Sequence, residues 1–299
     1  MTGGGLLGRL FVWFQYLLPQ HALSRLILAA TRVRAAWFKN GLIGSFLNHY
    51  PVDMTEAAES DPYRYGSFNE FFTRPLKTGV RSIAAGGSDI ACPVDGCISE
   101  AGRIDGDRLL QAKGRDYRLG ELLAGQSWAS RFAGGSFATI YLAPFNYHRI
   151  HMPLDGNLAD TVYVPGRLFS VNAVTAQYVP RLFARNERVL TLFDAACGQF
   201  ALVLVGALNV GSMATVWAGD ITPAARRVIT RLPAPPTRLE KGAELGRFNM
   251  GSTVILLFEP GRTRWHALLR AGSSVRLGQS IGTGQRLAQG PRMAAGQRP

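Results

Sequence analysis

Acidic residues are missing from the first 52 positions of this 299-residue chain, and in the whole chain 33 Lys and Arg stand against 20 Asp and Glu. The formal charge of +13 and the pI near 10.3 predict an anionic partner, for which nucleic acid and anionic lipid are the usual classes. The basic residues of the acid-free segment alternate with Leu, Ile, Phe and Trp, which favours a lipid surface. They are Arg9, Arg25, Arg32, Arg34 and Lys39.

Cysteine is also scarce, and the three present form neither an even set nor a C-x-x-C pair: Cys92, Cys97 and Cys197. Neither a disulfide framework nor a cysteine zinc site is therefore indicated, and a reducing compartment fits best. The chain has no G-x-x-x-x-G-K-S/T motif and no strand-borne G-x-G-x-x-G, so nucleotide binding has no support. With 47% hydrophobic residues the chain can nevertheless bury a sizeable core.

Long hydrophobic runs are absent from the basic N-terminus. Residues 6–18 are strongly apolar, but they include Arg9 and Gln15 and stop at Pro19, short of the roughly 20 residues that span a bilayer. We expect a helix that lies on a membrane. A second segment has apolar residues at helical spacing, and they are Leu23, Leu26, Ile27, Ala30, Val33 and Trp37. A helical hairpin packed on the protein's own core and a signal peptide are alternatives, although no clear small-residue cleavage site is present.

After residue 52 the pattern changes to that of a β-rich body. Residues 61–77 mix aromatic and basic side chains and predict a helical element ended by Pro75. Gly-rich turns then separate short apolar or alternating runs without regular βα alternation, which predicts strands with some helix. These runs are residues 137–142, 189–193, 200–205, 215–217 and 254–258.

Histidine occurs only five times, yet two histidines lie three residues apart in "YLAPFNYHRIHMPLDG", residues 141–156. If Pro144 opens a helical turn and Pro153 closes the segment, His148 and His151 share one face. A metal site would need further ligands that the sequence does not offer. Ordinary hydrogen-bonded histidines and proton-transferring histidines are the remaining alternatives.

Two further segments could complete a reactive site. "CPVDGCISE" places Asp95 in a Pro-x-Asp-Gly turn, and "FNMGSTVILLFEP" places Gly251, Ser252 and Thr253 before an apolar run. Each is compatible with an ordinary turn. Together with His151 they nevertheless provide the acid, the base and the hydroxyl of a nucleophilic triad, which depends on geometry rather than on chain order.

These segments together resemble the phosphatidylserine decarboxylase proenzymes. The motifs "FNEFFTRPLK", "PVDG", "QAKGRDY", "YLAPFNYHRIHMPLDG", "VPGRLFSVN", "FARNERV", "LVGALNVGSM" and "GRFNMGSTV" follow one another as that family has them, between about residues 10 and 282. The basic amphipathic N-terminus is similar to that of the membrane-associated bacterial members. Asn146 and Met250 depart from the residues that the family often has there, Asp and Leu, but neither removes a reacting group.

The resemblance implies that the chain cuts itself between Gly251 and Ser252, and that Ser252 becomes a covalent pyruvoyl cofactor at the start of the small chain. His151 would take the Ser252 proton, and Asp95 would orient His151. The mature enzyme, a lyase of phospholipid biosynthesis, would decarboxylate phosphatidylserine to phosphatidylethanolamine through a Schiff base. His148 would assist the decarboxylation, and no metal is implied.

The resemblance also implies an α+β fold, with amphipathic membrane-associating helices in residues 1–55 and a barrel-like or sandwich-like catalytic domain in residues 56–284. Residues 285–299 consist mainly of Gly, Gln, Arg and Ala without periodicity, which predicts a flexible tail. Chains 1–251 and 252–299 would stay associated after the cut and form a further homodimer on the cytoplasmic side of the cell membrane, without nucleic acid. Two other hypotheses remain, a serine hydrolase that leaves its chain intact and a non-catalytic lipid-binding protein.

Overall fold

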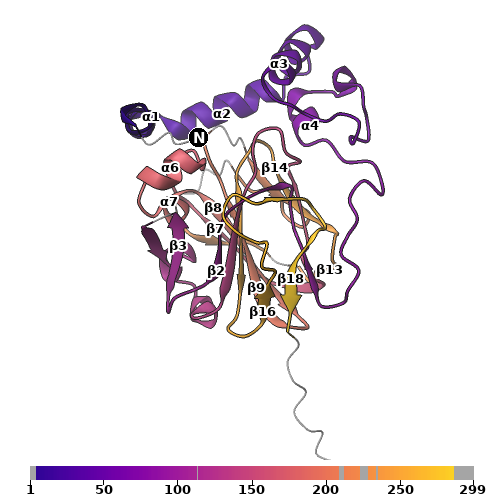
Figure 1. The fold of residues 1–299 in the computed structure, drawn as a ribbon. Helices are drawn as coiled ribbons and strands as arrows, with labels where there is room; N and C mark the ends of the chain where they lie inside the picture. Colours follow the sequence, from indigo (N-terminus) through magenta and orange to yellow (C-terminus); the bar gives the residue numbers. More distant parts are fainter. Residues whose placement is uncertain (1–4, 113, 209–211, 223–227, 234, 286–299) are drawn as a thin grey trace, which may run out of the picture.

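The computed structural model describes residues 5–285 except 113, 209–211, 223–227 and 234. N-terminal helices cover one end of a body of antiparallel strands, so the predicted α+β class is confirmed (Figure 1). The predicted tail, residues 285–299, lies outside the described residues apart from Gln285.

The three N-terminal helices are α1 (Leu6–Leu17), α2 (Gln20–Thr31) and α3 (Ala36–His49). The first ends before Pro19 as predicted. The prediction of one continuous second helix is wrong, because the chain leaves helical geometry between α2 and α3. In this break Arg32 pairs with Asp220 and Arg34 pairs with Glu70, and the sequence gives no local signal of either contact.

The remaining helical elements are short. Residues 61–77, predicted to be helical up to Pro75, form a 3₁₀ turn and the helix α4, and α4 ends before that proline. Ser67 caps α4 by accepting a hydrogen bond from the Glu70 amide. The elements are η1 (Pro62–Arg64), α4 (Phe68–Phe72), α5 (Leu119–Leu122), η2 (Ala129–Phe132), α6 (Ala173–Tyr178) and α7 (Leu182–Arg185).

The main sheet has nine strands, in the order β12-β7-β8-β9-β15-β5-β2-β17 with β13 also paired to β7. The strands are β2 (Gly96–Arg103), β5 (Ser136–Tyr141), β7 (Gly156–Val164), β8 (Arg188–Ala195), β9 (Gly198–Val205), β12 (Thr230–Arg231), β13 (Arg238–Leu239), β15 (Thr253–Phe258) and β17 (Ser274–Val275). All six residues of β15 are buried, because β5 and β9 flank this strand and both faces of the sheet are covered. The predicted strands at residues 137–142, 189–193, 200–205 and 254–258 are confirmed.

Three smaller sheets complete the body. One has the order β1-β18-β16, one has the order β11-β10-β14-β6, and one is the hairpin β3-β4. Their strands are β1 (Asp89–Ala91), β3 (Arg108–Ala112), β4 (Arg115–Arg118), β6 (Arg149–His151), β10 (Met213–Thr215), β11 (Gly219–Asp220), β14 (Glu244–Phe248), β16 (Thr263–Trp265) and β18 (Ser280–Gly284). The strand predicted at residues 215–217 is β10, which ends two residues earlier than expected.

Helices α1 and α2 turn polar side chains toward the body. Gln15 and Gln20 are buried, and their side-chain oxygens accept hydrogen bonds from the amides of Ser170 (2.8 Å) and Leu168 (2.9 Å). Gln15 also donates to the Thr175 hydroxyl at 3.3 Å. These hydrogen bonds to the 168–170 loop and to α6 are joined by apolar contacts, because Val12 is part of the main core and the Tyr16 ring lies 4.7 Å from the Phe169 ring.

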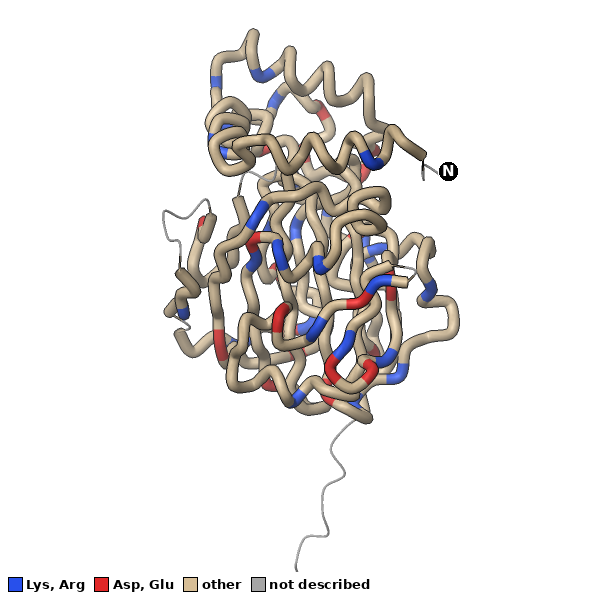
Figure 2. Tube along the Cα trace, turned by 90° about the vertical axis from the view of Figure 1, so that its left-hand side faces the viewer, with Lys and Arg blue, Asp and Glu red and all other residues tan. Residues whose placement is uncertain are grey.

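The outer surface of the same helices is apolar and basic. Seven large hydrophobic side chains of α1 are 44–82% exposed, and they are Leu6, Leu7, Leu10, Phe11, Trp13, Phe14 and Leu17. Trp37 at the start of α3 is 81% exposed. The three helices carry Lys and Arg but no Asp or Glu (Figure 2). This apolar outer face does not fit the alternative of a hairpin that buries its apolar residues on the protein's own core.

Candidate active site

The Gly251–Ser252 bond lies directly before β15, and Gly251 lines a pocket together with Phe46 of α3 and Phe72 of α4. The Ser252 carbonyl accepts a hydrogen bond from the Leu142 amide at 2.9 Å, so the main sheet fixes this end of the bond. Ser252 has no exposed surface, and its hydroxyl has no hydrogen-bond partner among the described residues. Burial of an unpaired hydroxyl costs about 1–3 kcal/mol, and at the predicted cleavage bond this cost is consistent with a hydroxyl kept free for reaction.

His148 is the histidine that lies beside this bond. A Cβ atom on residue 251 would lie 3.3 Å from His148 Nε2, so the absence of a side chain at Gly251 leaves room for this approach. His148 Nδ1 is 2.8 Å from the Asn146 carbonyl oxygen, which can only accept. In the neutral ring Nδ1 therefore carries the hydrogen, and Nε2 keeps a lone pair that no described residue binds.

The surroundings of His148 disfavour its protonation. Burial lowers the pKa of His148 to about 3, the hydrogen bond to Asn146 raises it, and the charge of Arg74 lowers it. The Phe72 ring covers the imidazole at a centroid distance of 4.2 Å. At neutral pH His148 is a neutral, weakly basic imidazole.

His151 lies on β6 and makes a different set of contacts. Its Nδ1 donates to the Gly242 carbonyl at 2.8 Å, and its Nε2 accepts from the Tyr147 hydroxyl at 3.0 Å. Burial lowers the pKa of His151, while the hydrogen bond to Gly242 and the charges of Glu244 and Asp95 raise it. This ring is thus kept more basic by its neighbours than the ring of His148.

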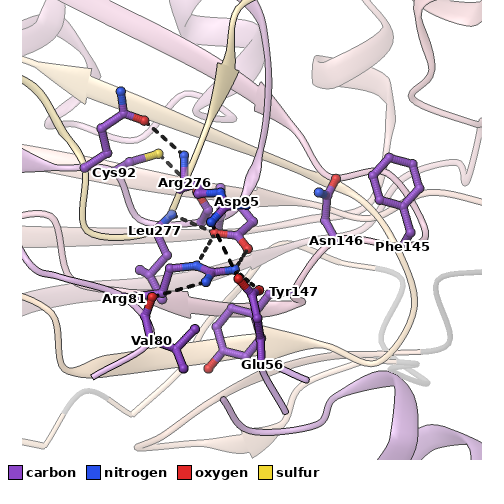
Figure 3. A network of polar contacts seen from close by, with 12 residues as sticks. Glu56, Val80, Arg81, Cys92, Asp95, Phe145, Asn146, Tyr147, Arg276 and Leu277 are labelled. Atoms are coloured by element: carbon purple, nitrogen blue, oxygen red, sulfur yellow. Dashed lines mark hydrogen bonds and ion pairs between the residues drawn. The ribbon is translucent and has the colours of Figure 1, made fainter. Parts of the chain in front are cut away.

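Asp95 lies in the turn between β1 and β2, as predicted, but its carboxylate is held by an arginine. Arg81 donates to both oxygens, from Nε at 3.1 Å and from Nη2 at 2.6 Å, and the Leu277 amide donates at 2.7 Å. Arg81 also pairs with Glu56 at 2.6 Å. Figure 3 shows the Arg81 guanidinium between the two carboxylates, with Tyr147 beside them.

The predicted site residues are thus only partly brought together. His148 adjoins the Gly251–Ser252 bond, whereas in the described part of the chain no hydrogen bond joins Asp95 to His151 or His151 to Ser252. The prediction of a helical turn that places both histidines on one face is wrong. His151 belongs to β6, which pairs with β14, and this pairing overrides the local effect of the flanking prolines.

Two pockets flank the site and meet at Tyr141. One has a volume of about 540 Å³ and is lined by Gly251, Met250, Phe72 and Phe46 among others, so α3 and α4 form part of its wall. The other has a volume of about 470 Å³ and contains Asp95 and Tyr147. In the described ranges no three His, Cys, Asp or Glu side chains converge where they could hold a metal ion.

Sequence reasoning did not identify three functional candidates. Arg81 stands in "KTGVRS", which carries no motif, and nothing near it in the chain indicates Asp95 as its partner. Tyr147 and Arg74 both lie inside motifs that carried the resemblance. An aromatic and a basic side chain within these motifs could have indicated that both residues belong to the site.

Comparison with known proteins agrees with this geometry. The family pattern described as phosphatidylserine decarboxylase matches residues 68–283, and a second pattern, PSD, matches residues 10–51. The phosphatidylserine decarboxylase proenzyme of Methylococcus capsulatus is 53% identical over 270 residues, which are 89% of this chain and 94% of that protein. The proenzyme of Pseudomonas aeruginosa is 54% identical over 272 residues, with the same coverage of both chains. The Ser252 hydroxyl is buried and unpaired at the predicted cleavage bond, and these matches cover most of the chain. This chain belongs to the phosphatidylserine decarboxylase family.

Proposed function

We propose that this chain cuts its own backbone between Gly251 and Ser252 and then decarboxylates phosphatidylserine at the new chain end. Membership of the family makes the chain a carboxy-lyase proenzyme of phospholipid biosynthesis with a pyruvoyl cofactor. The observation that carries the assignment of the bond is the Ser252 hydroxyl, which is buried without a partner at the start of a central strand.

In the proposed self-cleavage, Ser252 Oγ attacks the Gly251 carbonyl carbon and loses its proton to a base. The peptide C–N bond breaks as the nitrogen takes up a proton, which leaves an ester. Loss of the Ser252 α-proton and of the carboxylate then gives residues 1–251 with a free carboxyl end and a dehydroalanine on residues 252–299. Water hydrolyses that group to a pyruvoyl group and releases ammonia.

The structure gives a reason why both chains stay together after the cut. β15 belongs to the small chain, and it pairs along its full length with β5 and β9 of the large chain. Its six residues are all buried, so separation of the chains would expose a whole central strand to water. The mature protein is therefore expected to be a heterodimer that needs no covalent link.

We assign the base of the self-cleavage to His151 and the stabilisation of its charged form to Asp95. The pKa of His148, about 3, makes that ring too weak a base for a serine hydroxyl. The negative charge of Asp95 raises the pKa of His151, as the role requires. In this mechanism His151 Nε2 loses its hydrogen bond from the Tyr147 hydroxyl and accepts one from the Ser252 hydroxyl instead.

The decarboxylation is assigned to the space around Gly251. The pyruvoyl group made from Ser252 supplies the electron sink that loss of CO₂ requires. His148 is proposed to position the substrate by accepting a hydrogen bond at its unpaired Nε2, which lies beside residue 251. Phe46, Phe72 and Met250 keep the adjoining pocket largely apolar, and such a setting favours loss of a charged carboxylate as neutral CO₂.

The helices are proposed to hold the enzyme on the cytoplasmic face of the cell membrane as a peripheral protein. The apolar side chains of α1 face outward, and the basic residues of the helices suit an anionic leaflet. In the described parts of the chain, no helix is long and apolar enough to cross a bilayer. The pocket beside Gly251 is walled partly by α3, so a docked helix layer brings this pocket close to the lipid.

The test compares three variants in self-cleavage and in release of CO₂ from phosphatidylserine vesicles. We expect Ser252→Ala and His151→Ala to remain uncut and inactive. We expect His148→Ala to be cut but to release CO₂ about 100-fold more slowly, as for loss of a group that positions the substrate. A His151→Ala protein that cuts itself normally while His148→Ala stays intact would reverse the two assignments. An intact wild-type chain that hydrolyses esters, or binds lipid without reaction, would contradict the function.

A further inference from the structure

Arg74, in the loop after α4, is a buried arginine with very few partners. It is 4% exposed, and its Nη2 donates to the Phe145 carbonyl at a long 3.4 Å. Its Nε and Nη1 have no hydrogen-bond partner, and no carboxylate pairs with it, among the residues that the structure describes. The Phe71 ring, 5.7 Å from the guanidinium carbon, gives only weak compensation.

The other buried arginines of the body are satisfied. Arg188 is 3% exposed and donates to four backbone carbonyls at 2.6–2.9 Å. Arg81 donates to the carboxylates of Asp95 and Glu56. Arg188 lacks a counter-ion but has four acceptors, whereas Arg74 lacks a counter-ion and leaves two of its nitrogens without any acceptor among the described residues. A buried cation in that state is costly, so the exception at Arg74 indicates a place that an anionic ligand completes.

Arg74 lies at the edge of the reaction site. It lines the pocket of about 470 Å³ together with Asn146 and Tyr147, and this pocket meets the Gly251 pocket at Tyr141. Its charge acts directly on His148, whose pKa it lowers. Three carboxylates line the same pocket, those of Asp53, Glu56 and Asp95, but none of them pairs with Arg74. Arg81 holds Glu56 and Asp95 (Figure 3), and Thr55 donates to Asp53 from its amide and its hydroxyl.

We propose that Arg74 binds the phosphodiester oxyanion of the lipid head group. The proposal rests on the proposed function and adds a binding residue to it. The substrate offers a second oxyanion, its carboxylate, but a cation that holds the carboxylate would stabilise the group that must leave as neutral CO₂. The phosphodiester keeps its charge from substrate to product, so Arg74 can bind it throughout the reaction and contribute to affinity alone.

Kinetics of Arg74→Met and Arg74→Lys test this role in the matured enzyme. We expect Arg74→Met to raise KM for phosphatidylserine about 10-fold to 100-fold, as for the loss of a charge-assisted hydrogen bond, with kcat changed less than about 3-fold. Arg74→Lys should recover part of the affinity. Arg108→Met is the matched control, because Arg108 is half exposed and pairs with Asp116 on the β3-β4 hairpin. A fall in kcat with an unchanged KM would overturn the proposal.

Binding to the uncut Ser252→Ala chain separates this proposal from the proposed function, since it needs neither cleavage nor catalysis. Thermal shifts are measured with glycerophosphoethanolamine, whose only oxyanion is the phosphodiester, and with serine, whose only oxyanion is the carboxylate; both carry an ammonium group. We expect stabilisation by the phosphodiester that disappears in the Arg74→Met background and persists in the Arg108→Met background. Stabilisation by serine that depends on Arg74 would assign the carboxylate instead, and shifts independent of Arg74 would make Arg74 a structural cation.

Discussion

The helix layer and the β body follow opposite rules of burial. In the body, a strand such as β15 buries all six of its side chains, four of them Ile, Leu or Val. In α1 the buried residues are Val12 and Gln15, while seven large apolar side chains face outward. The body buries its apolar side chains within itself, whereas the helix layer leaves a row of them exposed. From this difference we expect stability and membrane binding to reside in separate parts of the chain.

At the end of the body beneath the helices, Ser252, His148 and Arg74 are buried with unpaired polar atoms. Buried atoms without a partner also occur elsewhere in the described body, for example Thr263 Oγ1 and Trp265 Nε1 on β16. What distinguishes the first three is that they lie at the Gly251–Ser252 bond or in the pockets beside it, which indicates reactive or binding roles. The site therefore lies where the two regions meet.

The largest expected contrast is in folding stability. Leu256→Ala on the central strand should lower the free energy of unfolding by about 2–5 kcal/mol, because it leaves a cavity in a close-packed core. Leu7→Ala, at an 82% exposed position, should change it by less than about 0.5 kcal/mol. Urea unfolding in the uncut Ser252→Ala background measures both. Equal losses of unfolding free energy in the two variants would contradict the claim that the β body, and not α1, carries the stability.

Membrane affinity should show the reverse contrast. Leu7→Ser and Trp13→Ala each remove apolar surface worth about 1.5–3 kcal/mol if it enters the bilayer, so each should weaken binding about 10-fold or more. Sedimentation with phosphatidylglycerol-containing vesicles measures this. Leu268→Ser is the matched control, since Leu268 is 83% exposed but lies on the body. Equal weakening by Leu268→Ser would contradict a membrane face confined to the helices.

Acid should destabilise the body through His148. The ordinary histidine pKa is about 6.5, and the folded value is about 3. Between these two pH values the unfolded chain binds a proton at this histidine that the folded chain does not. The contribution of His148 to the free energy of unfolding is therefore constant above about pH 6.5 and falls as the pH drops below that value. The free energy of unfolding should fall by about 1.4 kcal/mol per pH unit in this range.

The measurement is urea unfolding of Ser252→Ala at pH 7, 6 and 5, with and without His148→Gln. Below pH 6.5 the free energy of unfolding should fall less steeply with pH in the His148→Gln protein, by about 1.4 kcal/mol per pH unit. Parallel slopes in the two proteins would mean that His148 is not held neutral in the folded chain.

The smallest expected effect is at the boundary between the regions. Gln15→Leu leaves the Ser170 amide without its acceptor, and Ser170 lines the pocket beside Gly251. We expect a loss of about 1 kcal/mol in stability and a rise of a few-fold in KM for phosphatidylserine. Gln126→Leu, a partly exposed glutamine of the body, is the control. A change in vesicle binding without a change in KM would mean that Gln15 serves the helix alone.

The sequence predicted the core strands well because β15, β8 and β9 are buried on both faces and read as continuous apolar runs. It also placed Gly251 and Ser252 at a strand start, since small polar residues precede the run directly. The conformation around His148 and His151 was mispredicted, because prolines at both ends suggested a helical turn and long-range pairing of β6 with β14 decided otherwise.

The partners of Asp95 could not be predicted at all. Arg81 is 14 residues away and the Leu277 amide 182 residues away, and only the folded sheet brings them to one carboxylate. The division of the chain at residue 55 and the homodimer stay predictions.

The most direct test of the central claim is the intact mass of the denatured wild-type protein beside that of Ser252→Ala. Residues 252–299 are 48 of the 299 residues, so the account predicts a small chain of about 5.2 of the total 32.5 kDa. Its mass should be lower by about 17 Da, the mass of ammonia, than that of the same fragment with an N-terminal serine. The Ser252→Ala chain should remain whole. A wild-type chain that stays whole on its vesicles, or a small chain that begins with serine, would contradict the account.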